Sequence, residues 1–256
     1  MITQKLKFSD NSKQAKLKNI PIELAPNRSI WSFNLPSGFS CPGAKKCLSK
    51  ADKITGKITD GKDTLFRCFS ASDEARSTQA RAQRWHNFTL LRQYKNANDI
   101  AMLINQSLPS VDIDVIRIHV SGDFYSLAYF IAWIKVAKDN RNIRFYAYTK
   151  SINYWVHCID KKISIPSNLI LNASRGGRYD KLINDSKYQL KSAEVVFSLE
   201  QAEQRGLQID HNDSLAMTPG PNFANLLHGT QPIGSVASKA LRTLREKNTK
   251  YSYSRV

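Results

Sequence analysis

The feature that most constrains the fold is a fourfold alternation of strand-like and helix-like patterns in the middle of the chain. Apolar runs rich in β-branched residues predict strands at residues 111–122, 142–150, 168–173 and 193–199. Stretches with helical spacing follow them at residues 124–140, 151–162, 179–188 and 200–206. Such alternation is typical of repeated βαβ units, so we expect an α/β protein with a parallel sheet and right-handed crossovers.

Two architectures can hold this pattern. Four clear strands, with up to two flanking ones, are fewer than the eight of a complete βα-barrel. We therefore expect a partial parallel βα-barrel of four to six strands with an N-terminal loop region that carries cysteines; an open doubly wound sheet is the alternative. The 256 residues fit one α/β domain, with residues 1–28 as a basic N-terminal arm and residues 239–256 as a basic tail.

The charge indicates the class of partner. Lys and Arg number 38 against 21 Asp and Glu, a net charge of +17, which is typical of a protein that binds nucleic acid, DNA or RNA. A generally basic soluble protein and an anionic membrane partner are the alternatives. A helix predicted to begin near Ser72 and to run to Lys95 is expected to carry the contacts on its exposed face: Arg76, Arg81, Arg84 and Arg92.

The location follows from what the sequence lacks. No apolar stretch approaches the roughly 18 residues that span a bilayer, and the N-terminus has no signal-peptide pattern. We therefore expect a cytoplasmic protein without a membrane partner. No GxGxxG or GxxxxGKS motif occurs, so a dinucleotide fold or a P-loop NTPase is not predicted.

Three cysteines flank one basic, Gly- and Pro-rich loop. Cys41, Cys47 and Cys68 are separated by five and twenty residues. The fourth cysteine, Cys158, is expected on a helix, with its side chain in the protein core. Three thiolates can hold a [4Fe–4S] cluster with one iron open, or zinc with one further ligand. Three buried small residues without metal are the alternative. A metal centre predicts that the three side chains converge near the carboxyl ends of the strands.

Polar residues follow three of the predicted strands, where sites of parallel sheets lie. Asp123 comes after Ser121-Gly122, and its carboxylate could bind an ammonium, a ribose hydroxyl or a metal, or could cap the next helix instead. Tyr148 and Lys150 end the second strand, and with Asp123 they are the predicted catalytic residues.

The third strand ends in a predicted anion-binding loop. Gly176-Gly177 precedes a short helix and could form a nest of backbone N–H groups, where Arg175 and Arg178 would grip a phosphate or carboxylate. A solvated basic loop is the alternative. Ser174 is placed in the cofactor-binding set with Ser121, Gly122 and Asp123, and the four residues of the loop after it form the substrate-binding set.

Several motifs in order resemble the phage and plasmid "gene product 88" family: LPSGFSCPGAKKCLSKADKITGKITDG, FRCFSASDEAR, RWHNF, RIHVSGDF, RFYAYTKS, SRGGRYD and LLHGTQPIGS. They cover about residues 35–235. The resemblance implies a protein of a mobile element in a bacterial host cell.

A second resemblance is to radical S-adenosylmethionine enzymes, in which three cysteines bind three irons of a [4Fe–4S] cluster and S-adenosylmethionine chelates the fourth. It implies that Cys41, Cys47 and Cys68 are the cluster ligands and that Ser121-Gly122-Asp123 contact the methionine amine. The family spacing is C-x3-C-x2-C, so the twenty residues before Cys68 depart from it.

Three functions follow from these patterns. The first is an iron–sulfur enzyme of radical S-adenosylmethionine type that acts on nucleic acid or a nucleotide. The second is a nucleic-acid-binding protein with structural zinc or no metal. The third is a nuclease with His119, Asp123 and Asp213 around a divalent metal.

Overall fold

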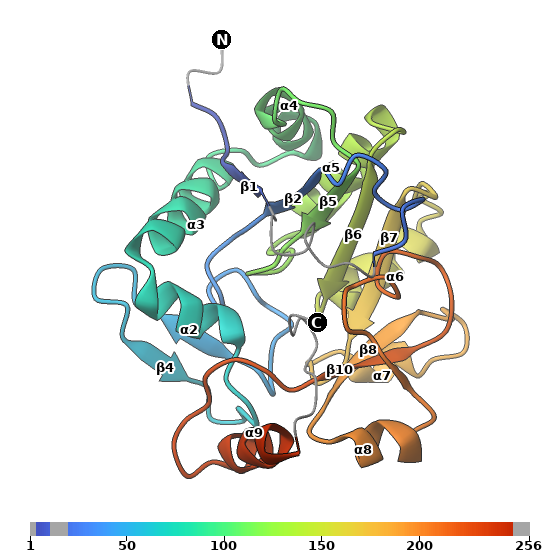
Figure 1. Ribbon diagram of the computed structural model, residues 1–256. Coiled ribbons are helices and arrows are strands. Elements are labelled where there is room, and N and C mark those ends of the chain that lie inside the picture. Colours follow the sequence, from blue (N-terminus) through green and yellow to red (C-terminus); the bar gives the residue numbers. More distant parts are fainter. Residues whose placement is uncertain (1–3, 11–19, 248–256) are drawn as a thin grey trace.

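One eight-stranded sheet organises the protein (Figure 1). The computed structural model describes residues 4–10 and 20–247. The strand order is β1-β2-β5-β6-β7-β8-β10-β9. All neighbouring strands run parallel except the β1–β2 pair, which is antiparallel. This confirms the predicted α/β class with a mostly parallel sheet.

The strands of the sheet are β1 (Phe8–Asp10), β2 (Ile30–Phe33), β5 (Val115–Ile118), β6 (Arg144–Thr149), β7 (Leu169–Ser174), β8 (Ser192–Val196), β9 (Gln208–Ile209) and β10 (Phe223–Leu226). A separate antiparallel hairpin pairs β3 (Ser49–Ala51) with β4 (Ile58–Asp60). The helices are α2 (Phe69–Arg76), α3 (Thr78–Leu91), α4 (Ala97–Ser107), α5 (Leu127–Asp139), α6 (Ile152–Asp160), α7 (Asp180–Ile183), α8 (Leu199–Gln204) and α9 (Val236–Glu246).

The four predicted strand–helix units are present as β5–α5, β6–α6, β7–α7 and β8–α8. The single helix predicted from Ser72 to Lys95 is wrong, because the chain forms α2 and α3 instead. Ser77 takes an extended backbone between them, and its hydroxyl accepts a hydrogen bond from the Ala80 N–H at 3.1 Å. The predicted count of four to six strands is too low, since edge strands as short as β1 and β9 leave no readable pattern.

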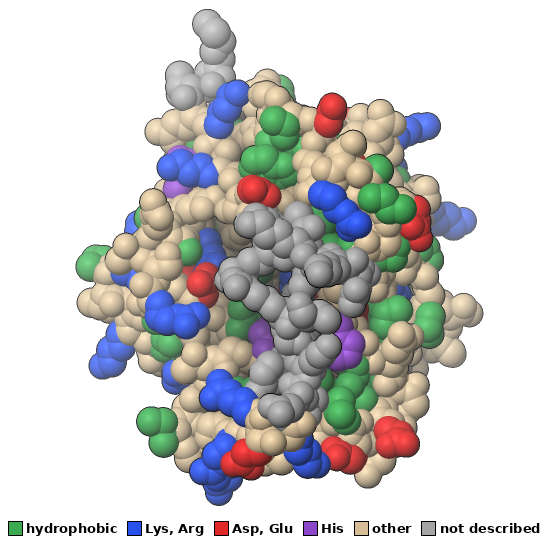
Figure 2. All heavy atoms as spheres, in the orientation of Figure 1, with side chains coloured by type: hydrophobic (Ala, Val, Ile, Leu, Met, Phe, Trp, Pro, Cys, Tyr) green, Lys and Arg blue, Asp and Glu red, His purple; other side chains and the backbone are tan. Residues whose placement is uncertain are grey.

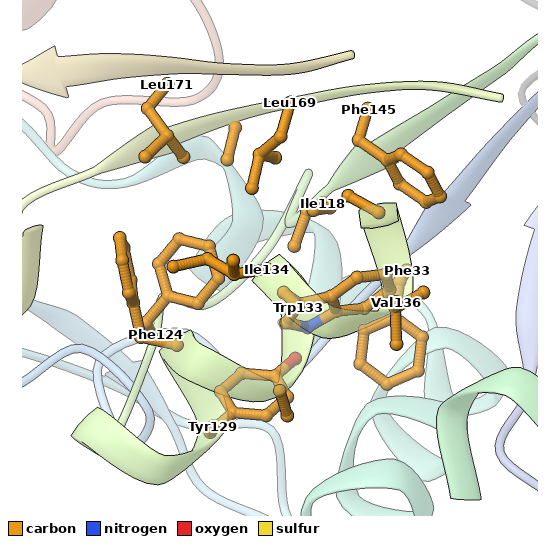
Figure 3. Close-up of a cluster of buried hydrophobic side chains, with 14 of the residues drawn as sticks. Phe33, Ile118, Phe124, Tyr129, Trp133, Ile134, Val136, Phe145, Leu169 and Leu171 are labelled. Carbon is orange, nitrogen blue, oxygen red and sulfur yellow. The ribbon is translucent and has the colours of Figure 1, made fainter. Parts of the chain in front are cut away.

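The main core lies between the sheet and the helices on one of its faces (Figure 3). Side chains of β6 alternate, so Phe145 and Ala147 face this core while Tyr146 and Tyr148 face the other way. Trp133 of α5 is fully buried against the sheet, and its ring lies 6.1 Å from that of Phe145. Cys158 of α6 is buried in the same core, which confirms that prediction.

The opposite face, here called the inner face, is covered by loops. Ile20, Leu24 and Ala25 from the N-terminal region and Met217 from the β9–β10 connection pack against it. The described part of residues 1–28 is therefore tied into the fold, and Leu6 is also buried. The rest of that predicted arm (1–3 and 11–19) and residues 248–256 of the predicted tail lie outside the described residues.

Candidate functional site

A cavity of about 170 Å³ opens at the carboxyl ends of the parallel strands. Its walls come from the inner face, with Arg117 of β5, Tyr148 of β6 and Asn225 of β10. The loops after the strands and the cysteine-bearing region complete it. Cavities of about 150 Å³ hold a benzene-sized molecule, so this one has room for a small inorganic group or part of a larger ligand.

Cys41, Cys47 and Cys68 all line this cavity, and none of them is in a disulfide. Burial raises the pKa of each thiol, to about 11 for Cys68. The pKa of Cys41 is raised further by the nearby Asp123 carboxylate and by its interaction with the other two cysteines. The thiols are therefore protonated at neutral pH, and a metal bound there would have to displace their protons.

The hairpin β3–β4 explains how Cys68 returns to Cys47 across twenty residues. Gly61 N–H donates to Leu48 O at 2.7 Å, and Leu65 N–H donates to Lys46 O at 2.7 Å. Cys68 N–H then donates to Ser49 Oγ at 3.3 Å. The intervening residues form the two paired strands β3 and β4. Cys47 and Cys68 therefore lie close together although twenty residues separate them in the sequence.

The cysteine loop docks directly on the end of β6. Arg178 N–H donates to Gly43 O at 2.9 Å, and Lys46 N–H donates to Gly176 O at the same distance. A Cβ at Gly43 would lie 2.0 Å from Lys150 O, so only glycine allows this approach. The loop is thereby held against the ends of both β6 and β7.

Asp123 lines the cavity and fastens two strand ends together. Its Oδ1 accepts hydrogen bonds from Thr149 Oγ1 at 2.6 Å and from Phe124 N–H at 2.7 Å, and its Oδ2 accepts one from Lys150 N–H at 2.8 Å. Burial raises the pKa of Asp123 to about 6, against the opposite effect of these hydrogen bonds. The alternative of a helix cap is wrong, because Ser126 caps α5 through Tyr129 N–H.

Lys150 also lines the cavity, but its ammonium is held by the chain. Nζ donates to Ser174 Oγ at 2.7 Å, to Ser174 O at 3.0 Å and to Arg175 O at 2.6 Å. Its positive charge acts to lower the pKa of Cys47, against the larger effect of burial. Lys150 is therefore placed to offset negative charge at the thiols and to hold the β7 loop.

The Gly176-Gly177 nest already has an anion from its own chain. Both N–H groups donate to the Asp180 carboxylate, each at 2.8 Å. Arg175 donates to Ser192 and Asn184 and does not line the cavity, and Arg178 is exposed. A substrate-binding role for this set stays a prediction, with the nest closed by Asp180.

Ser121 is buried and does not line the cavity, and its hydroxyl contacts a residue that the sequence analysis missed. Glu74 of α2 is fully buried, and its Oε1 accepts from Ser121 Oγ and from Ser37 N–H, both at 2.9 Å. Its ion-pair partner is Arg84, at 3.1 Å. Glu74 thus joins the cysteine loop to the loop after β5. A glutamate in a polar helix gave no signal of this role.

The inner face carries a second hydrogen-bonded group, and the sequence analysis named two of its members, Asp213 and Tyr148, without finding that they pair. Asp213 accepts from Arg117 Nη1 at 2.8 Å, from Tyr146 at 2.6 Å and from Tyr148 at 2.9 Å. The pattern of β6 could have shown it, because two tyrosines at i and i+2 lie on one face of a strand. Tyr148, a predicted catalytic residue, therefore connects the cavity to a buried carboxylate.

The expected exposure of two of the four predicted nucleic-acid contacts is wrong. Arg81 and Arg84 are each 6% exposed, and their guanidinium groups bind within the chain. Arg81 donates to backbone carbonyls of Lys53, Ile54 and Glu74. Arg76 and Arg92 are exposed. The helical pattern failed here because buried carboxylates and carbonyls outside α3 give these arginines partners in the interior.

Metal ligation by other residues was also expected. His119 and Asp123 line the cavity, whereas Asp213 is paired with Arg117. Over residues 4–10 and 20–247, no group of three or more His, Cys, Asp or Glu is arranged to hold a metal ion. This includes Cys41, Cys47 and Cys68, so neither the nuclease site nor a zinc site is preformed in this part of the chain. Nor does any described helix have the length and apolarity to cross a membrane.

Comparison with known proteins adds a family. The family model described as Gene product 88 matches residues 4–247. The "Gene 88 protein" of Mycobacterium phage L5 is 30% identical over 128 residues, and that of Mycobacterium phage D29 is 29% identical over 142 residues.

These alignments cover 46% and 52% of this chain, and 47% and 52% of the relatives. The chain thus matches about half the length of each. No solved structure matches it. The comparisons confirm the gene product 88 resemblance, and the resemblance to radical S-adenosylmethionine enzymes stays a prediction.

Proposed function

The chain belongs to the phage Gene product 88 family, and from the geometry of its cavity we propose that it is an iron–sulfur enzyme of radical S-adenosylmethionine type that acts on nucleic acid or a nucleotide. One observation carries the proposal. Three cysteines far apart in sequence line one cavity at the carboxyl ends of a parallel sheet.

The strand order supports a partial barrel around this cavity. The six parallel strands from β2 to β10 follow one another in chain order. Right-handed crossovers then place successive helices on the same face, and α5, α6 and α7 do share one core. A doubly wound sheet would reverse its strand order near the middle. The polar inner face would then be the interior of the barrel.

The donor set suits a cluster chemically. Thiolate ligands of such clusters are stabilised by hydrogen bonds to sulfur, and Gly38 N–H donates to Cys41 Sγ at 3.3 Å. Lys150 places a positive charge near Cys47, and all three cysteines are partly buried. When bound and reduced, a [4Fe–4S] cluster would supply the electron that cleaves S-adenosylmethionine.

The remaining residues would orient the ligands. Asp123 uses three of the roughly four acceptor positions of a carboxylate, which leaves one for the ammonium of a bound cofactor. At neutral pH it is ionised, as that role requires, because its pKa is about 6. The Tyr148 hydroxyl donates a hydrogen bond to Asp213, and the Tyr148 side chain lines the cavity.

Anaerobic purification followed by reconstitution with iron and sulfide tests the cluster. We expect absorbance near 400 nm and about four irons per chain. Cys41→Ser, Cys47→Ser and Cys68→Ser should each lose it, while Cys158→Ser is the matched control and should keep it. Colourless protein with one tightly held zinc, or a cluster that survives all three substitutions, would overturn the proposal.

Binding of S-adenosylmethionine to the loaded protein tests the type of enzyme. Calorimetry should show saturable binding that Asp123→Ala weakens at least tenfold, because the variant lacks the carboxylate for the ammonium. The cluster absorbance of the variant is the control for the metal site. Loaded protein that binds no S-adenosylmethionine would overturn this part of the proposal.

A further inference from the structure

A cluster of aromatic and lysine side chains lies beside the cysteine loop, outside the cavity. The Phe39 and Trp85 rings are 4.9 Å apart and tilted by 59°. Lys50 Nζ lies 5.2 Å from the Phe39 ring centre, and Lys53 Nζ lies 5.3 Å from that of Trp85. We call these four residues the aromatic–lysine platform.

Three of the four platform residues are open to solvent, and Trp85 is half-buried against the main core. Phe39 is 39% exposed, which is unusual for a large ring, and both lysines are exposed. Neither lysine forms an ion pair with a carboxylate of the described residues. The rings hold the two ammonium groups in place without neutralising them.

The surrounding hairpin adds further positive charge. Residues 45–62 contain six lysines and two aspartates. The Asp60 carboxylate is paired with Arg67, and that of Asp52 accepts hydrogen bonds from Ile54 and Thr55. The four other lysines are also exposed: Lys45, Lys46, Lys57 and Lys62. Figure 2 shows Lys and Arg side chains along the left and lower edge of that view, where Figure 1 places β4 and α9.

The platform is joined to the cavity by a few bonds. Phe39 precedes Cys41 by two residues, and Lys50 follows Cys47 by three. Gly38, next to Phe39, donates to the Cys41 sulfur. A ligand seated on the platform is therefore close to the three thiols.

We propose that the aromatic–lysine platform binds single-stranded nucleic acid and leads the strand to the cysteine-lined cavity. Exposed rings stack on bases of any sequence, and lysines around them track the phosphates. A duplex keeps its bases paired and hides their faces, so it can use the lysines alone. That the bound strand is then a substrate at the cavity rests on the proposed function. The binding of the strand to the platform does not require the iron–sulfur cluster.

Fluorescence anisotropy with a labelled 20-nucleotide oligo-dT at 50 mM salt tests the binding. Lys50→Ala with Lys53→Ala should weaken it about tenfold or more, because two phosphate contacts are lost. Lys138→Ala with Lys161→Ala is the matched control, since both residues are exposed and the net charge changes equally. The control should stay within twofold of the unmodified protein.

Stacking needs its own variant. Phe39→Ala should weaken oligo-dT about tenfold while a 20-base-pair duplex, bound less tightly, changes little. Oligo-dT should also quench tryptophan fluorescence, and Trp85→Phe should remove most of the quench. Lys50→Arg with Lys53→Arg should bind like the unmodified protein, and melting curves confirm that each variant is folded.

Three results would overturn the inference: platform variants that bind within twofold of the unmodified protein, a weakening equal to that of the control pair, or a preference for duplex. The failure of the proposed function looks different. If Cys41→Ser, Cys47→Ser and Cys68→Ser together leave oligo-dT binding intact while no cluster forms on the unmodified protein, the platform stands and the enzyme assignment falls.

Discussion

At the scale of single residues, burial decides which charged groups the fold tolerates. His119 follows β5 with a positive φ of 69°, which turns it out of the strand alternation and into an aromatic cluster. Its Nε2 lies 2.9 Å from the Tyr129 hydroxyl, and the ring is 3% exposed. Burial lowers the pKa of His119 to about 3. The folded protein therefore keeps this ring neutral.

This pKa gives a pH prediction. An unfolded His titrates near 6.5, so below that pH the unfolded state binds a proton that the folded state does not, and stability falls. The free energy of unfolding of the unmodified protein should drop by about 2 kcal/mol between pH 7 and pH 5 relative to His119→Phe. Denaturant titrations of both proteins at the two pH values measure it. Parallel pH profiles would contradict the prediction.

The buried ion pair of Arg84 gives a second prediction at this scale. Arg84→Met leaves the Glu74 carboxylate without its cation inside the protein, which should cost about 3–5 kcal/mol of unfolding free energy. Arg76→Met, on the exposed face of the neighbouring helix, is the control and should change little. Thermal or urea unfolding compares the two. Weakened nucleic-acid binding with unchanged stability would instead restore Arg84 as a contact residue.

At the scale of elements, the sequence predicted the repeated strand–helix units. It did not predict features that depend on contacts between residues far apart in the chain. The strand–helix units from β5 to α8 were readable because each carries a full local pattern of alternation or helical spacing. The break at Ser77 was not, since helix formers surround it on both sides. The role of Asp123 also depends on the Lys150 N–H group of another loop, and no local pattern encodes which group that will be.

The site was partly predictable for the same reason. Three cysteines and the residues Asp123 and Lys150 stood out by type and by their positions in loops or at strand ends, and the structure places all five around one cavity. Their partners were not predictable. Lys150, predicted to be catalytic, donates three hydrogen bonds from its ammonium group to Ser174 and Arg175.

The docking of the cysteine loop on β6 gives a prediction for an element contact. Gly43→Ala should push the loop away from Lys150 O, because the added Cβ would come within 2.0 Å of that oxygen. We expect a lower melting temperature and faster reaction of the cysteines with a thiol reagent. Gly61→Ala is the control, since the nearest atoms to its Cβ belong to the Leu48 side chain and lie no closer than 3.0 Å. Equal thiol reactivity in the two variants would contradict the tight approach.

At the scale of the whole molecule, the net charge of +17 raises the question of whether binding follows total charge or local placement. Salt screens exposed charges beyond about 10 Å at 0.1 M, so a phosphate chain responds mainly to the lysines it touches. Six exposed lysines lie within residues 45–62, beside the cysteine loop. Local placement should therefore dominate.

The slope of log K against log salt measures this placement. Each phosphate contact on a single strand contributes about −0.7, so six hairpin lysines predict a slope of about −4 for oligo-dT. Lys50→Ala with Lys53→Ala should reduce its magnitude by about 1.4, while Lys138→Ala with Lys161→Ala, which removes the same charge elsewhere, should leave it unchanged. If both double substitutions reduce the magnitude of the slope equally, total charge governs binding, and the hairpin lysines contribute no more than lysines elsewhere.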